Sequence, residues 1–299
     1  MKKSKILKII LLALLLLLIL AVAVSLIKYF TGYEIYRDVK YSSGELNVMD
    51  VYLPKSAYER DKNGLVLFIH GGSWVGGDKS EESGRCRLLA SHGYIVASVN
   101  YTLWSEENAD TYNVSQVLDE LDTALFALKE FAAERGITID KAATTGYSAG
   151  AHLAMLYAFS RPESAPLDIV FTASMAGPAD MSSEVWGDDL TIGIIERLTG
   201  EKVTRDMLST TYAEGIIASV SPSFFVNESS VPTLLVHGGR DDVVPIANAE
   251  SLIARLEEYS VKHDYVYMKD SNHSLIQNPI GRLRYFGKLI EYCKEYFRY

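Results

Sequence analysis

The feature that most constrains the fold of this chain is the pentapeptide Gly146-Tyr147-Ser148-Ala149-Gly150, together with its flanking segments. Residues 139–145 before it suit a buried strand, and residues 151–158 after it suit a helix. A strand that turns so sharply into a helix brings the two backbones close together. Such a turn needs small residues at both ends, and it lifts the serine oxygen clear of the sheet. The pattern predicts a strand–turn–helix unit with Ser148 at its apex, although the pentapeptide also fits a glycine-rich helix start.

Strand-like and helix-like segments alternate along the rest of the chain. Continuous apolar runs, as expected for strands covered on both faces, occur at residues 64–69, 94–99, 169–174 and 233–236. A run at residues 46–54 alternates in part and ends at Pro54, which is typical of an edge strand. Residues 114–135 carry apolar side chains at helical spacing. This alternation predicts an α/β fold in which helices flank a mainly parallel central sheet.

The segment between about residues 178 and 222 departs from this alternation. It holds several short amphipathic pieces and no good strand. A connection of this length is too long for a plain loop in a compact domain. We therefore expect it to form a small helical cap over the C-terminal edge of the sheet.

The N-terminus differs in character from the rest of the chain. Lysines at positions 2, 3, 5 and 8 precede a run from Ile9 to Ile27 that has no charged residue and one polar residue, Ser25. At about 1.5 Å per residue the run can cross a hydrocarbon core of about 30 Å, and the lysines predict a cytoplasmic N-terminus. We expect an uncleaved transmembrane helix, a signal anchor that holds the folded body outside the cytoplasm. The alternative is a signal peptide cleaved near Ala21-Val22-Ala23, which would release a secreted protein.

These features divide the chain into three parts. Residues 1–28 are the expected anchor or signal segment, residues 29–45 a linker, and residues 46–299 a single domain that carries the cap. The first part contains lysines and no acidic residue, whereas the whole chain has 38 acidic and 29 basic residues. The body is therefore acidic and has no general electrostatic reason to bind nucleic acid. The spacing of the only cysteines, Cys86 and Cys293, does not indicate a metal site and leaves their pairing open.

Two later loops carry side chains that complement a nucleophilic serine. One strand-like run ends in a loop with Asp241 and Asp242, and a later one, residues 265–268, ends in a polar loop with His273. Catalytic groups gather at the C-terminal ends of strands in open α/β sheets. A serine hydroxyl attacks when a histidine takes its proton, and a carboxylate orients that histidine. Because serine, acid and histidine follow one another in a known order, we predict a triad of Ser148, one of the two aspartates and His273.

The segment that follows the strand at residues 64–69 predicts a site for a negatively charged oxygen. It reads His70-Gly71-Gly72-Ser73-Trp74, and its glycines allow the backbone N–H groups to turn toward one point. Acyl transfer develops charge on such an oxygen, and one preorganised donor is worth about 3–4 kcal/mol. We expect the amides of Gly72, Ser73 and Ala149 to form this oxyanion hole. The competing interpretation is an ordinary glycine turn that closes a strand.

With these motifs the chain resembles the esterase and lipase group of α/β-hydrolases. It is most similar to the carboxylesterase-like branch whose oxyanion motif reads His-Gly-Gly-x-Trp-x-x-Gly-x-Lys. The matching residues are His70, Gly71, Gly72, Trp74, Gly77 and Lys79. The resemblance covers about residues 50–299 and implies the α/β-hydrolase fold.

The resemblance also bears on the acid of the triad. The pattern Asp-x-x-Val-Pro of this group implies Asp241, with Val244 and Pro245 matching, and leaves Asp242 as the neighbouring alternative. The group often has arginine at the position of Thr102, where this chain departs from it.

The activity implied by the resemblance is hydrolysis of carboxylic esters through an acyl-enzyme on Ser148. It requires no metal and no organic cofactor, and the expected substrate is a small-molecule ester or an acylated polymer. An aminopeptidase-like amidase and an arylformamidase are alternatives on the same triad. The alternative from another class is a membrane-anchored binding module without catalytic activity.

Several other residues carry weaker expectations. We expect three other histidines not to act as bases: His70 and His237, which end strands and brace loops, and His152, which lies in the first turn of the helix after Ser148. The solvent-facing side of a helix is expected to carry Asp119, Glu120, Asp122 and Lys129. Aromatic residues that suit either the core or an acyl pocket are Trp74, Trp104, Trp186, Phe224 and Phe225.

Overall fold

An eight-stranded sheet forms the centre of the protein in a computed structural model that describes residues 2–161 and 163–298. The strands are β1 (Tyr33–Lys40), β2 (Val48–Pro54), β3 (Asn63–Ile69), β4 (Ile95–Val99), β5 (Ile139–Tyr147), β6 (Asp168–Met175), β7 (Thr233–Gly238) and β8 (His263–Met268). Their order is β1-β2-β4-β3-β5-β6-β7-β8. β2 pairs antiparallel with β1 and with β4, and all the other neighbouring strands pair in parallel, so the sheet is mainly parallel as predicted.

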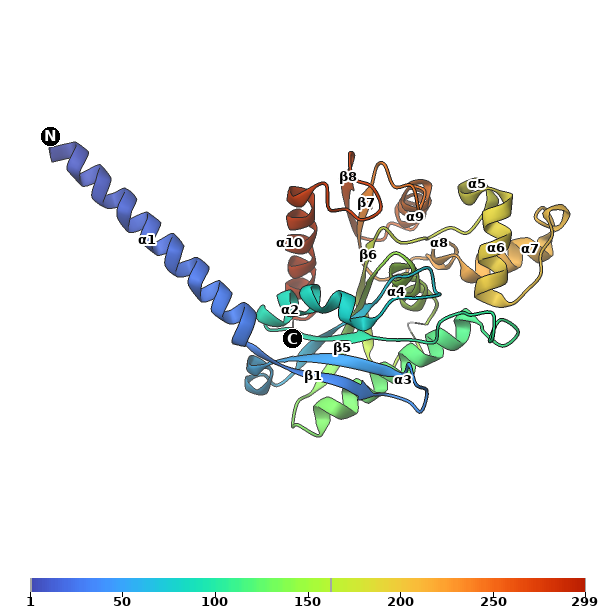
Figure 1. Ribbon diagram of the computed structural model, residues 1–299, viewed down its shortest axis with the longest axis horizontal. Coiled ribbons are helices and arrows are strands. Elements are labelled where there is room, and N and C mark those ends of the chain that lie inside the picture. Colours follow the sequence, from blue (N-terminus) through green and yellow to red (C-terminus); the bar gives the residue numbers. More distant parts are fainter. Residues whose placement is uncertain (1, 162, 299) are drawn as a thin grey trace.

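Helices flank this sheet on both sides (Figure 1). The helices of the described chain are α1 (Lys2–Thr31), which does not cover the sheet, α2 (Ser83–Ser91), α3 (Val114–Ala133), α4 (Ala149–Ser160), α5 (Ser183–Trp186), α6 (Asp188–Thr199), α7 (Thr211–Val220), α8 (Pro222–Phe225), α9 (Ala247–Glu258) and α10 (Pro279–Tyr296). Short 3-10 turns lie at η1 (Lys55–Glu59), η2 (Lys79–Glu82) and η3 (Arg205–Met207). Met1, Pro162 and Tyr299, which belong to the expected anchor and domain, lie outside the described residues.

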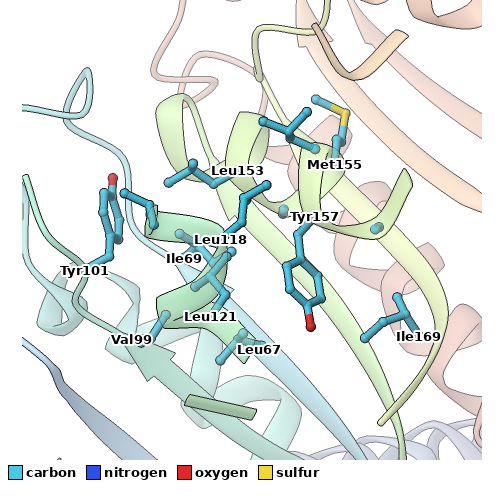
Figure 2. Close-up of a cluster of buried hydrophobic side chains, with 14 of the residues drawn as sticks. Leu67, Ile69, Val99, Tyr101, Leu118, Leu121, Leu153, Met155, Tyr157 and Ile169 are labelled. Atoms are coloured by element: carbon cyan, nitrogen blue, oxygen red, sulfur yellow. The ribbon is translucent and has the colours of Figure 1, made fainter. Parts of the chain in front are cut away.

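Two apolar clusters hold the helices on the sheet. Successive residues of a strand point to opposite faces, so Leu65, Leu67 and Ile69 of β3 join one cluster while Val66 and Phe68 join the other. Helices α3, α4 and α9 cover the first cluster, and α2 and α10 cover the second. Figure 2 shows the first cluster, in which β3 side chains meet those of α3 and α4. Full burial of such a side chain contributes about 1.5–3 kcal/mol, so this sandwich holds the strand ends in fixed positions.

The stretch expected to be a linker contains a strand. Residues 33–40 form β1, which pairs antiparallel with β2 at the edge of the sheet. Most side chains of β1 are exposed or half-buried, and Tyr33 is its buried residue. The strand therefore lacks the continuous apolar pattern by which the inner strands are recognised. Only Gly32 separates β1 from the end of α1.

Helix α1 projects away from the body (Figure 1). Residues Ile6–Thr31 form a helix long and apolar enough to cross a membrane, and its most apolar window has none of its residues buried. Its contacts with the body are made mainly with α2. Exposed leucine and isoleucine side chains along this helix carry a large cost in water, which a hydrocarbon environment removes.

The segment between β6 and β7 is helical, as its short amphipathic pieces predict. Residues 178–222, all of which the structure describes, contain helices and turns and no strand. Ile195, Leu198, Ile217 and Val220 from this segment join the cluster that contains α3 and α4. The segment thus extends the helical layer on one side of the sheet, where α5, α6 and α7 lie side by side (Figure 1).

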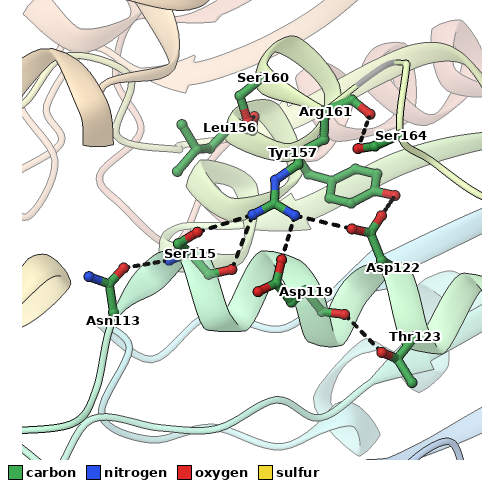
Figure 3. A network of polar contacts seen from close by, with 10 residues as sticks. All are labelled: Asn113, Ser115, Asp119, Asp122, Thr123, Leu156, Tyr157, Ser160, Arg161 and Ser164. Atoms are coloured by element: carbon green, nitrogen blue, oxygen red, sulfur yellow. Dashed lines mark hydrogen bonds and ion pairs between the residues drawn. The ribbon is translucent and has the colours of Figure 1, made fainter.

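The acidic side of α3 is the predicted solvent face only in part, because Asp119 and Lys129 are exposed while Glu120 and Asp122 are half-buried. Arg161 after α4 lies 2.5 Å from Asp119 and 3.2 Å from Asp122 (Figure 3). The hydroxyl of Tyr157 donates to Asp122 over 2.5 Å. Glu120 is also engaged, because it accepts hydrogen bonds from both the amide and the hydroxyl of Thr102. These contacts bind α3 to α4 and to the loop after β4.

The cysteines do not form a disulfide. Cys86 in α2 and Cys293 in α10 are both buried in the second apolar cluster and carry free thiols. Burial raises the pKa of each thiol well above its usual value. Both side chains therefore serve as small apolar packing groups.

Candidate active site

Ser148 lies at the sharp turn between β5 and α4. Its φ and ψ are 55° and −123°, a strained conformation that non-glycine residues seldom adopt. The turn leaves no room for side chains at its ends. A Cβ at Gly146 would lie 2.3 Å from the carbonyl carbon of Gly150, and a Cβ at Gly150 would lie 2.0 Å from the oxygen of Ile69. The amide of Ser148 donates to Met175 over 2.9 Å, which ties the strained residue to β6.

The structure brings Ser148, His273 and Asp241 together at the C-terminal edge of the sheet. His273 Nε2 lies 2.9 Å from Ser148 Oγ, and His273 Nδ1 lies 2.8 Å from Asp241 Oδ2. The parallel register aligns the strand ends, since Tyr147 pairs with Met175 on β6 and Met175 pairs with Val236 on β7. The three side chains thus come from loops after β5, β7 and β8.

Asp241, and not its neighbour Asp242, makes these contacts. Its side chain is fully buried, and Oδ1 accepts hydrogen bonds from the amides of Val243 and Val244 at 3.0 and 2.9 Å. Burial alone would raise the pKa of this carboxyl, but the hydrogen bonds from His273 and from these amides outweigh it, and the pKa lies below its usual value. Asp242 is exposed. Asp241 is therefore ionised at neutral pH, and its Oδ2 accepts a hydrogen bond from the N–H at Nδ1 of His273.

Tyr147 holds the histidine loop against the serine turn, a role that the sequence pattern does not indicate. Its hydroxyl donates to the carbonyl of His273 over 3.0 Å, and the two rings lie 5.1 Å apart. Burial raises the pKa of this hydroxyl to about 12, so it keeps its proton.

His237 also contacts the buried carboxylate. Its Nε2 lies 3.0 Å from the carbonyl oxygen of Val244 and 3.3 Å from Asp241 Oδ2. A carbonyl can only accept, so Nε2 must carry the hydrogen. Burial lowers the pKa of His237, which favours the neutral ring. The neutral ring thus presents one N–H to the oxygen that also accepts from His273.

The glycine-rich loop after β3 lies next to the serine. A Cβ at Gly71 would lie 3.4 Å from the Cβ of Ser148. Gly72, Ser73 and Trp74 all have positive φ, at 113°, 53° and 63°. Among the residues that the structure describes, the amides of Gly72, Ser73 and Ala149 donate no hydrogen bond. These three amides are therefore free to donate to another group, which the predicted oxyanion hole requires.

Two buried histidines brace this loop. His70 stacks on Tyr101 with ring centres 4.5 Å apart, and its Nδ1 lies 2.7 Å from the oxygen of Gly71. His152 accepts from the indole N–H of Trp74 over 3.2 Å, and its Nε2 lies 2.8 Å from the carbonyl oxygen of Val220 in the helical segment. Burial lowers the pKa of His152 to about 4, so it stays neutral.

Trp74 is thus buried in the core, with its indole N–H bonded to His152. The other four aromatic residues named above as pocket candidates lie in and around the helical segment. Trp186 donates from its indole N–H to Asp180 over 2.7 Å, Trp104 and Phe225 pack against the core, and Phe224 is half exposed.

Lys79 connects the end of the glycine-rich loop after β3 to the edge of the sheet. The sequence motif that contains Lys79 does not indicate this contact. Its ammonium lies 2.8 Å from Asp38 on β1 and 2.8 Å from Asp50 on β2. Its amide donates to Asn100 over 2.6 Å. Asp50 is fully buried, whereas Asp38 is 72% exposed. Removal of one partner from a buried pair such as Lys79 and Asp50 costs about 3–5 kcal/mol, so β2 helps to fix the glycine-rich loop.

Within the described residues, no group of three or more His, Cys, Asp or Glu side chains is arranged to hold a metal ion. The chemistry that the arrangement supports is nucleophilic attack by Ser148 with proton transfer through His273.

The chain is similar to known esterases in sequence. The family model BD-FAE matches residues 49–256. The esterase LipQ of Mycobacterium tuberculosis is 23% identical over 79% of this chain and 56% of its own length. A probable isoprenylcysteine alpha-carbonyl methylesterase of Arabidopsis thaliana is 23% identical over 84% of this chain and 54% of its own. This chain spans about half the length of these curated relatives.

Solved structures share the fold. A truncated carbohydrate esterase from gut microbiota superposes with a TM-score of 0.72 at 19% identity, covering 88% of this chain and 96% of that one. Esterase B from Lactobacillus rhamnosis superposes with a TM-score of 0.69 at 18% identity, covering 94% and 95%. At these identities the likeness extends to the fold, with its mixed sheet and flanking helices.

Proposed function

Because the chain belongs to the BD-FAE family of α/β-hydrolase esterases, we propose that it hydrolyses carboxylic esters with Ser148, His273 and Asp241 as its triad. The observation that carries the proposal is the continuous set of contacts from Asp241 through His273 to Ser148. The three unpaired amides beside Ser148 support it.

In the proposed reaction the Ser148 hydroxyl attacks the ester carbonyl carbon while His273 Nε2 takes its proton. The carbonyl oxygen becomes negative and accepts hydrogen bonds from the amides of Gly72, Ser73 and Ala149. The C–O bond to the alcohol then breaks, and His273 returns the proton to the departing oxygen. Water repeats the sequence on the acyl-serine and yields the carboxylic acid and free Ser148.

The carboxylate of Asp241 has two tasks in this scheme. It holds the proton of His273 on Nδ1, which leaves Nε2 free to accept from the serine. It also stabilises the imidazolium that forms after proton transfer. The lowered pKa of the carboxyl keeps this charge present across the neutral range.

The proposal is tested by labelling the full chain with a fluorophosphonate probe and by a substrate panel. We expect covalent labelling at Ser148 and turnover of short acyl p-nitrophenyl esters. Preferred turnover of aminoacyl amides or of formyl-kynurenine would instead assign the triad to an amidase or an arylformamidase. A chain that neither reacts with the probe nor turns over any of these compounds would be a binding module.

We further propose that α1 is a signal anchor that leaves the domain outside the cytoplasm. Support comes from the length and exposure of its apolar stretch and from the lysines that precede it. Extraction of membranes with carbonate should leave the full-length chain in the membrane fraction. A mature chain that begins after Ala23 would show that the segment is a cleaved signal peptide.

The natural substrate is proposed as a small ester or an acylated polymer met outside the cytoplasm. The carbohydrate esterase among the structural neighbours makes acylated polysaccharide a natural first compound to assay. Release of acetate or of an aromatic acid from such a polymer measures this directly.

Replacement of Gly72 by Ala tests the oxyanion loop. Gly72 has a φ of 113°, and an added Cβ would lie 2.1 Å from the oxygen of Gly76, so the loop must move. We expect kcat for p-nitrophenyl butyrate to fall about 100-fold with little change in KM. Gly76→Ala is the matched control, because nothing lies within 4 Å of its added Cβ. Equal kcat values in the two variants would contradict the assignment.

His237 is predicted to position Asp241. In His237→Phe the carboxylate loses the N–H at 3.3 Å, and we expect kcat/KM to fall about tenfold with a changed pH profile. His237→Gln places an amide donor near the same point and should recover most of the activity. If His237 served packing alone, Phe would keep the wild-type pH profile and only the melting temperature would change.

A further inference from the structure

A hollow lies where α1 joins the body. It has a volume of about 480 Å³ and lies between the end of α1, η1 and the end of α2. Its polar lining consists of Ser25, Lys28, Ser56, Arg60, Ser91 and His92, with no acidic side chain. This lining is unusual for a chain of net charge −9. Glu59 and Asp61 flank Arg60 in sequence but do not line the hollow. The hollow therefore suits an anionic group such as a phosphate.

An apolar groove continues from this hollow along α1. It has a volume of about 380 Å³, and Ala21, Val22, Leu26 and Leu88 contribute to its lining. The two spaces share Ser25, Ser91 and His92 in their linings. A site that is cationic at one end and apolar along a helix matches a molecule with a charged head and a hydrocarbon tail.

The position of the hollow along α1 agrees with this chemistry. The apolar stretch ends at Thr31 and β1 begins at Tyr33. The junction is held by hydrogen bonds from the Tyr33 hydroxyl to Tyr29 over 2.6 Å and from the Lys55 amide to Gly32 over 3.1 Å. A hydrocarbon core of about 30 Å takes up about 20 helical residues. An α1 that crosses the membrane therefore brings the hollow to the level of the lipid headgroups.

We propose that this junction binds one phospholipid, with its phosphate in the cationic hollow and one acyl chain in the groove along α1. Lys28 and Arg60 supply the positive charge. Arg60 is held in place by its Nη1, which donates to the oxygen of Gly93 over 2.5 Å. The bound lipid would hold the body in one orientation against the membrane. The inference rests on the proposed membrane attachment of α1 and not on the esterase activity.

The test is native mass spectrometry of the detergent-purified full chain titrated with dioleoyl phosphatidylglycerol. We expect Lys28→Gln/Arg60→Gln to bind this lipid about tenfold more weakly than the wild type. The control is Lys129→Gln/Lys202→Gln, which removes the same charge from α3 and from the loop after α6 and should bind normally. Arg60→Lys keeps the charge and should also bind normally. Equal affinity of the two double variants would overturn the proposal.

Two further measurements are needed. One distinguishes a phospholipid from free phosphate as the ligand, and the other tests the membrane attachment on which the proposal rests. Inorganic phosphate should not displace the lipid, because it lacks the tail. Full displacement would reduce the site to a phosphate site and overturn the phospholipid assignment. Flotation of the wild type with phosphatidylglycerol vesicles reports membrane attachment. Failure to float would overturn both the membrane attachment of α1 and the phospholipid site. Hydrolysis of p-nitrophenyl butyrate should be the same in all variants, so a failure of the esterase proposal remains a separate result.

Discussion

Replacement of Ser148 by Ala is expected to lower kcat for p-nitrophenyl butyrate by about 10⁴- to 10⁶-fold. The variant keeps the fold, because the one side-chain hydrogen bond that Ser148 makes is to His273. It loses the oxygen that is proposed to attack the carbonyl beside the free amides of Gly72, Ser73 and Ala149. The residual rate then comes from binding and the oxyanion hole alone.

The measurement is steady-state hydrolysis together with fluorophosphonate labelling and a thermal melt. Ser164→Ala provides the control, since Ser164 is exposed and, within the described residues, its hydroxyl donates to Arg161 alone. We expect the control to be active and labelled, and Ser148→Ala to be inactive and unlabelled with a normal melting temperature. Turnover by Ser148→Ala near the wild-type rate would remove the serine from the reaction.

Replacement of Asp241 by Asn is expected to lower kcat by about 10³- to 10⁴-fold. The amide NH₂ of Asn would donate to Nδ1 of His273, which favours the tautomer with the proton on Nε2. Nε2 then cannot accept the proton of Ser148. Asp242→Asn changes the same charge one residue away on an exposed side chain and should keep wild-type kcat. If Asp242→Asn were the inactive variant, the two aspartates would exchange roles.

The same pair of variants carries a prediction for acid stability. The pKa of Asp241 is lower in the folded protein than the unfolded value of about 3.9. Its ionised form therefore stabilises the fold above the unfolded pKa, and this contribution is lost as the pH falls through the folded pKa. Urea unfolding at neutral and acidic pH should show a smaller acid-induced loss of stability in Asp241→Asn than in Asp242→Asn.

The inner strands and the serine turn are the most predictable parts of this protein. β3, β4, β6 and β7 are covered on both faces, so their residues form continuous apolar runs that stand out in the sequence. The turn at Ser148 is equally visible because backbone crowding demands glycine at two spaced positions. Local patterns of this kind need no knowledge of distant partners.

Contacts between distant segments are harder to predict. β1 is missed because most of its side chains are exposed or half-buried and its pairing with β2 is made by backbone groups that every residue carries. Glu120 and Asp122 look like surface charges until Thr102 and Arg161 are placed beside them. The same holds for Lys79, whose partners Asp38 and Asp50 lie 41 and 29 residues earlier in the chain.

The predicted site residues depend on both kinds of information. The choice between Asp241 and Asp242 rests on the loop conformation, in which Oδ1 of Asp241 accepts from two following amides. The roles of Tyr147 and His237 depend on how the strand ends align across the sheet. A histidine one residue before a strand end or an aromatic residue within the turn gives no local sign of these contacts.

The single residue between α1 and β1 limits where the proposed enzyme can work. A long flexible tether lets a tethered domain sweep a large volume, whereas one glycine leaves it almost no reach. With α1 in a bilayer, encounters with substrate would be confined to a thin layer next to the membrane. A soluble ester would diffuse into that layer freely, but an immobile polymer would be cleaved only where it touches the membrane surface. Lengthening the junction would widen the range of polymer sites that one anchored molecule serves.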